Sequence, residues 1–246
     1  MFEKLIELGF QIEYRSHARA ILSADFPAAA AELQEALVEI SLPIKEIIAG
    51  GGGETKLTQR LRHRLAALGW QKSRFDVQKI INGQQTQSQS HEIDHVYQTG
   101  GNTIVLEIEW NNKDPFFDRD LENFKRLHAD GAISLGAIIT RGTSLQAGMV
   151  SAIKRFLAEQ HITSLDALRA FGVQPTARQR QTIEARTNRA VNPIAFHDAF
   201  AESFVADKFG AATTHWSKLE DRIQRGVGNP CPLLLIGLPA SIVSFD

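Results

Sequence analysis

The chain has 246 residues and carries 27 Lys and Arg against 28 Asp and Glu, which gives a formal net charge of −1 at pH 7. This balance excludes a generally basic protein, so any DNA-binding surface must be local, with acidic residues segregated elsewhere. The length and an apolar content of 43% are ordinary for a globular protein whose core is large enough to fold without disulfides.

Cellular location follows from a few sequence features. The single cysteine, Cys231, cannot form an internal disulfide, which fits a reducing cytoplasm. The N-terminal MFEKLIELGF is too short and too charged for a signal peptide, and no stretch approaches 18 consecutive apolar residues. We therefore expect a soluble, cytoplasmic protein.

The first third of the chain predicts strands and helices in alternation. Residues 10–23 are expected to form a strand or an edge hairpin, and 27–40 a helix with Pro near its start. After the glycine run at 50–53, leucines at helical spacing predict a helix over 55–68. Residues 74–83 have the composition of a strand.

The central part predicts a hairpin followed by a helix. The polar segment 84–91 is expected to be a loop, and 92–98 and 103–110 to be two strands joined by a turn at 99–102. A helix is expected over 116–128.

The remainder predicts one buried strand and several helices. We expect a buried strand over 132–140, a helix over 145–160 and a more polar helical region over 161–200. Residues 213–239 predict a basic helix, a turn and a short apolar strand. With no internal repeat and no clear linker, one α/β domain with helical additions is the economical interpretation.

Acidic residues interrupt the apolar strand TIVLEIEW (103–110). Because side chains alternate along a strand, Glu107 and Glu109 share one face with Val105, and the opposite face is apolar. Burying adjacent carboxylates unpaired is costly, and a divalent cation would offset the cost. Mg²⁺ prefers such oxygen ligands, and Asp94 on the neighbouring strand supplies a third carboxylate. The alternative is a surface hairpin with solvated acids.

These acids suit hydrolysis of a phosphodiester. A metal held by Asp94 and Glu107 would polarise the phosphate and lower the pKa of a bound water. Glu109 would then receive that water's proton or help to hold a second metal. Glu54, which begins the helix after the glycines, is a fourth candidate; its alternative role is a helix-capping acid in the first turn.

Several segments together resemble a known family. HEIDHV (91–96), IVLEIEWNNKDPFFDRDL (104–121) and AISLGAIITRG (132–142) resemble the BglII/BstYI family of type II restriction endonucleases. The segment 213–239 resembles that family's C-terminal block. The resemblance covers about 50–150 and 210–240.

The resemblance implies a fold and an activity. The fold would be restriction-endonuclease-like (PD-(D/E)XK): a central mixed β-sheet flanked by helices on both sides. Residues 1–246 would form a single endonuclease domain, with its catalytic core in about 50–150 and a helical DNA-contact region in 155–246. The activity would be hydrolysis of both strands of a short palindromic DNA site, GATC-centred as a first guess, leaving 5′-phosphates. One or two Mg²⁺ ions per active site, a homodimer and a companion DNA methyltransferase are also implied.

The resemblance also assigns roles in the catalytic site. By position, Asp94 and Glu107 would bind metal, together with Ile108 between the two glutamates. Glu109 falls where the family shows Gln or Glu instead of the usual Lys, so the general base stays open between Glu109, a metal-bound water and a substrate phosphate. Glu54 matches only by its place on a helix.

Basic residues supply candidates for DNA contact. They lie near the acids, on the helix after the glycines and on the C-terminal helix, and they are Lys113, Arg60, Arg64, His215, Lys218, Arg222 and Arg225. The alternatives are solvated helix faces, pairing with Glu220 and Asp221, and helix capping by Lys113. The segment 84–91 is another candidate, because glutamine reads adenine edges.

Two other interpretations remain open. His91, Glu92 and His95 flank Asp94 and suggest zinc, although ordinary surface or pocket histidines are the preferred explanation because no cysteine accompanies them. For function, the alternatives are a structure-directed repair or recombination nuclease of the same fold, and a DNA-binding protein that does not cleave.

Overall fold

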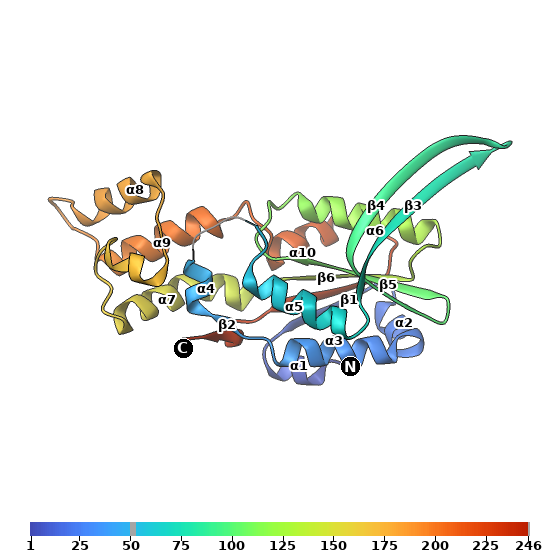
Figure 1. Cartoon of the computed structure of the whole chain (residues 1–246), viewed down its shortest axis with the longest axis horizontal. Helices are drawn as coiled ribbons and strands as arrows, with labels where there is room; N and C mark the ends of the chain where they lie inside the picture. Colours follow the sequence, from blue (N-terminus) through green and yellow to red (C-terminus); the bar gives the residue numbers. More distant parts are fainter. Residues whose placement is uncertain (50–52, 246) are drawn as a thin grey trace.

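A computed structural model describes residues 1–49 and 53–245, without the side chain of Gln87. Its centre is a six-stranded sheet in the order β1-β7-β6-β5-β4-β3 (Figure 1). The pairs β5–β6 and β6–β7 are parallel, and the other three pairs are antiparallel. The strands are β1 (Gln11–Arg15), β3 (Gln71–Ile81), β4 (Gln84–Thr99), β5 (Asn102–Glu109), β6 (Leu135–Arg141) and β7 (Leu233–Leu238). A separate parallel pair joins β2 (Leu42–Pro43) and β8 (Val243–Ser244).

Helices cover both faces of this sheet, as the alternation of side chains along its strands requires. Ile104 and Leu106 of β5 enter the larger apolar core, whereas Val105 enters a second core on the opposite face. The larger core is covered by α1 (Glu3–Glu7), α2 (Ala18–Asp25), α3 (Pro27–Val38), α4 (Ile44–Ile48), α5 (Lys56–Ala67) and α7 (Thr143–Glu159). The second core is covered by α6 (Phe116–Ala129) and α10 (Trp216–Gln224). The predicted mixed sheet between two helical layers is confirmed.

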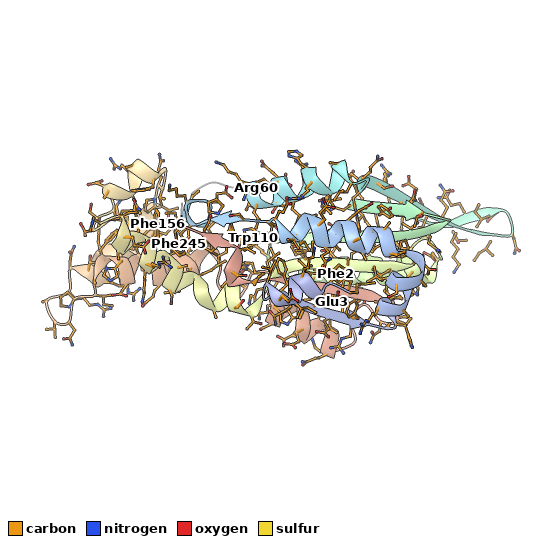
Figure 2. All side chains as sticks on the ribbon, turned by 90° about the horizontal axis from the view of Figure 1, so that it is seen from below. Phe2, Glu3, Arg60, Trp110, Phe156 and Phe245 are labelled. Atoms are coloured by element: carbon orange, nitrogen blue, oxygen red, sulfur yellow. The ribbon has the colours of Figure 1, made fainter. Side chains whose placement is uncertain are left out.

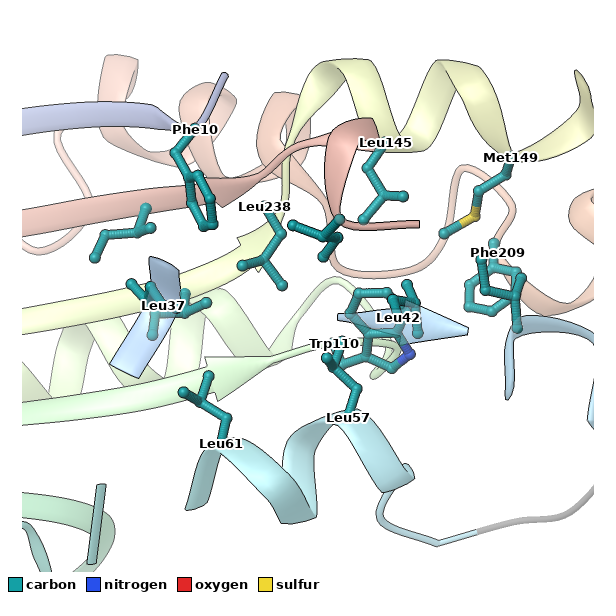
Figure 3. Close-up of a cluster of buried hydrophobic side chains, with 14 of the residues drawn as sticks. Phe10, Leu37, Leu42, Leu57, Leu61, Trp110, Leu145, Met149, Phe209 and Leu238 are labelled. Atoms are coloured by element: carbon teal, nitrogen blue, oxygen red, sulfur yellow. The ribbon is translucent and has the colours of Figure 1, made fainter. Parts of the chain in front are cut away.

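Helix α5 forms where the leucine spacing predicts it. Leu57, Leu61 and Leu65 are buried along one side, and Figure 3 shows the first two directed from α5 toward the sheet and Trp110. The hydroxyl of Thr55 caps the helix by accepting a hydrogen bond from the backbone N–H of Thr58 at 3.2 Å. Of the glycine run at 50–53, for which the sequence predicts a hinge or a loop, residues 50–52 lie outside the described residues.

Two sequence predictions about local structure are corrected. The strand expected in 10–23 forms only over β1, and most of the rest of that segment belongs to helix α2. The expected loop 84–91 belongs to strand β4. β3 and β4 together form a long hairpin that turns at Asn82 and Gly83, both with positive φ (51° and 76°). Positive φ at two central residues characterises the type I′ turn, for which Asn-Gly is a preferred pair.

The C-terminal half is helical around the last strands. The helix predicted over 145–160 is α7, and the region 161–200 contains the short 3₁₀ helix η1 (Ala167–Phe171), α8 (Ala177–Thr187) and the start of α9 (Phe196–Lys208). A second 3₁₀ turn, η2 (Ala240–Ile242), precedes β8. The α7–α9 group lies at the opposite end of the molecule from the β3–β4 hairpin (Figure 1), and Figure 2 shows Phe156 and Phe245 at that end. Among the described residues, no helix has the length and apolarity to span a membrane.

Candidate active site

The two strands that carry the predicted acids separate at the site. The pairing of β4 with β5 runs from Thr99–Asn102 to His95–Leu106. Asp94 and Glu107 are the next residues on the two strands, so they face each other where the ladder ends. On the other side of β5, pairing with β6 continues to Glu109–Thr140. The site therefore opens at the point where β4 leaves the sheet.

A β-bulge marks the same point on β4. Between the pairs Gln71–Val96 and Ser73–Ile93, β3 advances by two residues and β4 by three. The extra residue lies at the position of Asp94 and His95, and bulges of this kind redirect side chains near active sites. The buried ring of His95 anchors the bulge, because its Nδ1 lies 3.2 Å from the carbonyl oxygen of Leu106.

A cavity of about 330 Å³ lies beside Asp94 and Glu107. It is bounded by β4, β5 and α6, and its lining residues are Ser90, His91, Glu92, Asp94, Glu107, Arg119, Asp120 and Asn123. The structure thus brings two of the predicted acids together. Arg119, Asp120 and Asn123 were not predicted.

Glu107 is the acid with the strongest perturbation. Burial, together with the negative charges of Asp120, Asp94 and Glu109, raises its pKa to about 9 against a smaller opposing effect of Arg119. Without a cation, this side chain holds a proton at neutral pH. A bound cation would remove that penalty, because it favours the charged form of every acid around it.

Glu109 lies on the same face but is not among the lining residues. It is 2% exposed, and its Oε2 accepts a hydrogen bond of 2.8 Å from the side-chain amide of Asn112. Burial raises its pKa to about 8, with Asp120 as the next cause. Glu109 is therefore a second, deeper carboxyl group rather than a solvent-exposed base.

Asp120 completes the acidic group from helix α6. Arg119 donates to its Oδ1 from Nε at 2.8 Å, and Nη2 of the same guanidinium lies 2.7 Å from that oxygen. The buried Oδ2 meets no donor among the described residues. Its neighbour is the carboxyl group of Glu109, so a hydrogen bond between them requires that one of the two carries a proton. Burial raises the pKa of Asp120 as well.

Asp120 could have been found from the sequence. It falls between Phe117 and Phe124 on the apolar stripe of α6, next to Leu121, where a carboxylate is out of place. An acid at a buried helical position is expensive unless it is paired or functional. The amphipathic pattern of 116–128 contained this signal.

The donor atoms at the site fit a hard divalent cation. Asp94 and Glu107 offer carboxylates, and Ile108, whose side chain is apolar, offers its carbonyl oxygen. Carbonyls alternate along a strand: that of Leu106 points toward β4, and that of Glu109 points toward β6, where it accepts from Thr140 Oγ1 at 2.7 Å. The Ile108 carbonyl therefore points toward the β4 side, beyond the last β4–β5 pair.

The arrangement of the described side chains is nonetheless open. No three His, Cys, Asp or Glu side chains among the described residues converge closely enough to enclose a metal. The carboxylate of Asp94 lies 3.4 Å from Lys72 Nζ, which also lies 2.6 Å from Glu92. Two carboxylates, one carbonyl and room for water are the partial shell that Mg²⁺ accepts. For zinc, the same finding offers no support to the group of His91, Glu92 and His95.

Glu54 is not brought to this cavity. It lies 3.1 Å from Arg62, and the helix that follows it packs on the opposite face of the sheet from Glu107. The fourth carboxyl group at the site is that of Asp120.

The predicted basic residues on α5 take part in internal pairing. Arg60 binds Glu46 through both terminal nitrogens, at 2.7 and 2.9 Å, and donates to the carbonyl of Ser41 at 2.8 Å. Arg64 pairs with Glu39. Neither arginine lines the cavity, and both tie α5 to the preceding segments.

On the basic helix α10, the predicted DNA contact Arg222 is a buried side chain that forms ion pairs within the protein. Arg222 is only 8% exposed and reaches Asp114 and Asp118, each at 3.1 Å. It joins α10 to the start of α6, so our prediction that Arg222 contacts DNA does not fit its position. Lys218 lies 3.8 Å from the same Asp114.

The remaining basic candidates lie nearer to solvent. Lys113 is exposed and forms a β-bridge with Thr213. His215 is partly buried, and burial together with nearby Arg141 lowers its pKa. Arg225 is exposed and donates to the backbone of Asp221. These three remain predicted DNA contacts.

The fold and the cavity together define a class of protein. A mixed sheet between two helical layers, with acids where two neighbouring strands separate, is consistent with a restriction-endonuclease-like fold. The sequence matches the family model described as "Restriction endonuclease BglII/BglIII" over residues 10–238, and the chain belongs to this family. No curated protein sequence matches the chain significantly.

Family membership establishes the general activity. The chain is a nuclease, a hydrolase whose substrate is DNA. The match also includes 155–205, which the motif resemblance left out.

Proposed function

We propose that the protein is a type II restriction endonuclease that hydrolyses both strands of a short palindromic DNA site, with Mg²⁺, and leaves 5′-phosphates. The observation that supports this most directly is the cavity in which Asp94 and Glu107 face each other, in a chain of a restriction endonuclease family. A two-fold site is naturally read by a homodimer, and cutting host DNA would require a companion methyltransferase. A cytoplasmic location follows from that role.

Asp94, Glu107 and the carbonyl of Ile108 would hold the metal. When bound, Mg²⁺ would lower the pKa of a ligated water and neutralise charge on the phosphate. Glu107 must lose its proton for this, which its high pKa makes sensitive to pH. Arg119, half exposed at the cavity and fixed by Asp120, presents positive charge for the incoming phosphate.

The neighbouring buried carboxyl groups of Glu109 and Asp120 support a role in proton transfer. The pKa values of both groups are raised, so each binds a proton more readily than an ordinary carboxyl group. Glu109, with its pKa raised to about 8, can exchange a proton close to neutral pH, where a general base is most effective. We propose that the pair, rather than Glu109 alone, receives the proton released from the attacking water.

A digest of unmethylated phage DNA tests the proposal. The wild type is compared with Glu107→Gln, with Mg²⁺ or with EDTA. The matched control is Glu122→Gln, the same substitution on α6 outside the cavity, at a residue paired with Lys125. Discrete fragments that require Mg²⁺, persist in Glu122→Gln and vanish in Glu107→Gln are expected, and their mapped ends would give the site.

Other outcomes would replace the proposal. A smear of fragments would indicate a nuclease directed by DNA structure rather than sequence. Absence of cleavage with a sequence-selective gel shift would indicate a binding protein, and would remove the catalytic roles of Asp94, Glu107 and Glu109.

A further inference from the structure

The β3–β4 hairpin extends far beyond the sheet. Figure 1 shows its paired ends curving away from the rest of the molecule, and from 78 to 90 every side chain that the structure describes is exposed. Only nearer the sheet do Phe75 and Val77 pack against the second core. We call residues 78–90 the ribbon.

The ribbon begins at the cavity. Ser90, at its base, is one of the lining residues, and Asp94 follows four positions later on the same strand. With a rise of about 3.3 Å per residue, the six steps from Ser90 to Gln84 span roughly 20 Å. A duplex rises about 3.4 Å per base pair, so this reach corresponds to about six base pairs.

The chemistry of the ribbon is unusual for a protein surface. The segment QKIINGQQTQSQS contains five glutamines, three hydroxyl residues, one lysine and no acid. Such side chains both donate and accept hydrogen bonds but add little charge. They are poorly suited to binding phosphates, which calls for Lys and Arg, and well suited to base edges.

The tip of the ribbon carries exposed apolar side chains. Ile80 is 62% exposed and Ile81 48% exposed, among the few large hydrophobic side chains in solvent. In the major groove, glutamine pairs with the N6 and N7 atoms of adenine, and apolar side chains contact the methyl group of thymine. A two-stranded β-ribbon fits this groove.

We infer that the ribbon enters the major groove beside the cleaved phosphate and reads A·T base pairs through its glutamines and tip isoleucines. This inference rests on the proposed function, because it makes the ribbon the specificity element of the same nuclease. The ribbon contributes sequence selection, while the cavity contributes cleavage.

The test compares the wild type with a triple variant that combines Gln78→Ala, Gln85→Ala and Gln89→Ala. All three side chains are exposed, so folding should be unaffected. The control is Gln181→Ala, an exposed glutamine of α8 at the other end of the molecule. Cut ends are mapped on unmethylated phage DNA, and cleavage rates are measured on a duplex with the mapped site and on duplexes with one base pair changed.

The triple variant should lose at least about fivefold in discrimination between the site and its single-change relatives, with the control unchanged. In wild type, replacing one adenine of the site by 7-deazaadenine, which lacks N7, should slow cleavage by a similar factor. The triple variant should be insensitive to that replacement. Replacing a thymine of the site by uracil, which lacks the methyl group, should likewise slow cleavage by the wild type. The double variant Ile80→Ala with Ile81→Ala should be insensitive to this replacement.

Full discrimination in the triple variant, with an unchanged 7-deazaadenine effect, would overturn the inference and leave the proposed function intact. Loss of the dimer on a sizing column with unchanged discrimination would also overturn it and assign the ribbon to protein contact. If the wild type cuts no DNA, the proposed function fails. In that case, competition gel shifts measure how strongly the wild type and the triple variant prefer phage fragments over a random duplex. The same preference in both proteins, or no preference in either, would overturn the inference.

Discussion

Strand β4 has an inner and an outer segment that differ in their pairing and in their burial. The inner segment, 93–99, pairs with β3 at Ile93 and Val96 and with β5 from His95 to Thr99, and its Ile93, His95 and Val96 are buried. The outer segment, 84–92, pairs with β3 alone and is exposed along nearly its whole length. The bulge at Asp94 and His95 lies just inside the boundary between them.

The two segments of this one strand therefore meet different structural requirements. The inner segment must hold a carboxylate opposite Glu107 against a hydrophobic core, so its side chains are constrained by packing and by charge. The outer segment is held by backbone pairing, which leaves its side chains free to contact solvent or a ligand. Substitutions on the two segments should therefore affect different measurements.

The largest expected effect is on cleavage. Asp94→Asn should reduce the cleavage rate by about 1000-fold or more, since a lost metal ligand removes about 4 kcal/mol of transition-state stabilisation. Glu92→Gln is the comparison from the outer segment: Glu92 lines the same cavity and contacts the same Lys72, but it lies two residues further from the β4–β5 pairing than Asp94. Its rate should stay within about threefold of wild type. If single-turnover assays showed equal losses of cleavage rate in the two variants, the proposed difference between the inner and outer segments would be wrong.

The next largest effect is on stability. Ile93→Ala should lower the free energy of unfolding by about 2–5 kcal/mol, because Ile93 is buried in the second core. Gln85→Ala should change it by less than about 0.5 kcal/mol, because its side chain is exposed. Urea denaturation of both variants measures the contrast. A large loss in Gln85→Ala would show that the ribbon packs against something.

A smaller effect concerns pH. The pKa of Glu107 is raised to about 9 in the fold, so the folded protein binds the extra proton and its stability falls as pH rises from about 4.5 toward 9. In EDTA, Glu107→Gln should remove this loss and raise the melting temperature at pH 8 by at least about 2 °C, equivalent to about 1 kcal/mol. At pH 4 the difference should vanish. A flat difference across pH would contradict the raised pKa, and Glu122→Gln serves as control.

The smallest effect is expected at the junction between the segments. Lys72 pairs with both Glu92 and Asp94, but all three side chains are more than half exposed. Exposed ion pairs contribute little, so Lys72→Met should leave the urea midpoint unchanged within error. A clear shift would mean that Lys72 fixes the position of Asp94, and cleavage assays of the same variant would then show it.

Local patterns were sufficient to predict the hairpin that carries Asp94, Glu107 and Glu109. The alternation in 103–110 placed Glu107 and Glu109 on one face, and the neighbouring apolar run placed Asp94 on the paired strand. Both inferences depend on residues close in sequence. Helices α5 and α6 were predicted for the same reason, because their apolar spacing is local.

The errors have particular causes. The second strand of the ribbon, within 84–91, was predicted as a loop because glutamine and serine give no strand pattern, although Asn82-Gly83 is a hairpin signal. Arg222 was predicted as a DNA contact from helical spacing on α10, and its true partners, Asp114 and Asp118, are more than 100 residues away. Only tertiary packing brings such groups together.

The free two-residue turn of the hairpin also bears on how such a nuclease diversifies. The tip contacts no core, so the ribbon can gain or lose paired residues without disturbing the domain. Two residues added to each strand keep the alternation of faces and extend the reach by about 7 Å, or roughly two base pairs. The length of the ribbon can therefore change during evolution while the bulge and its neighbouring acids keep their positions.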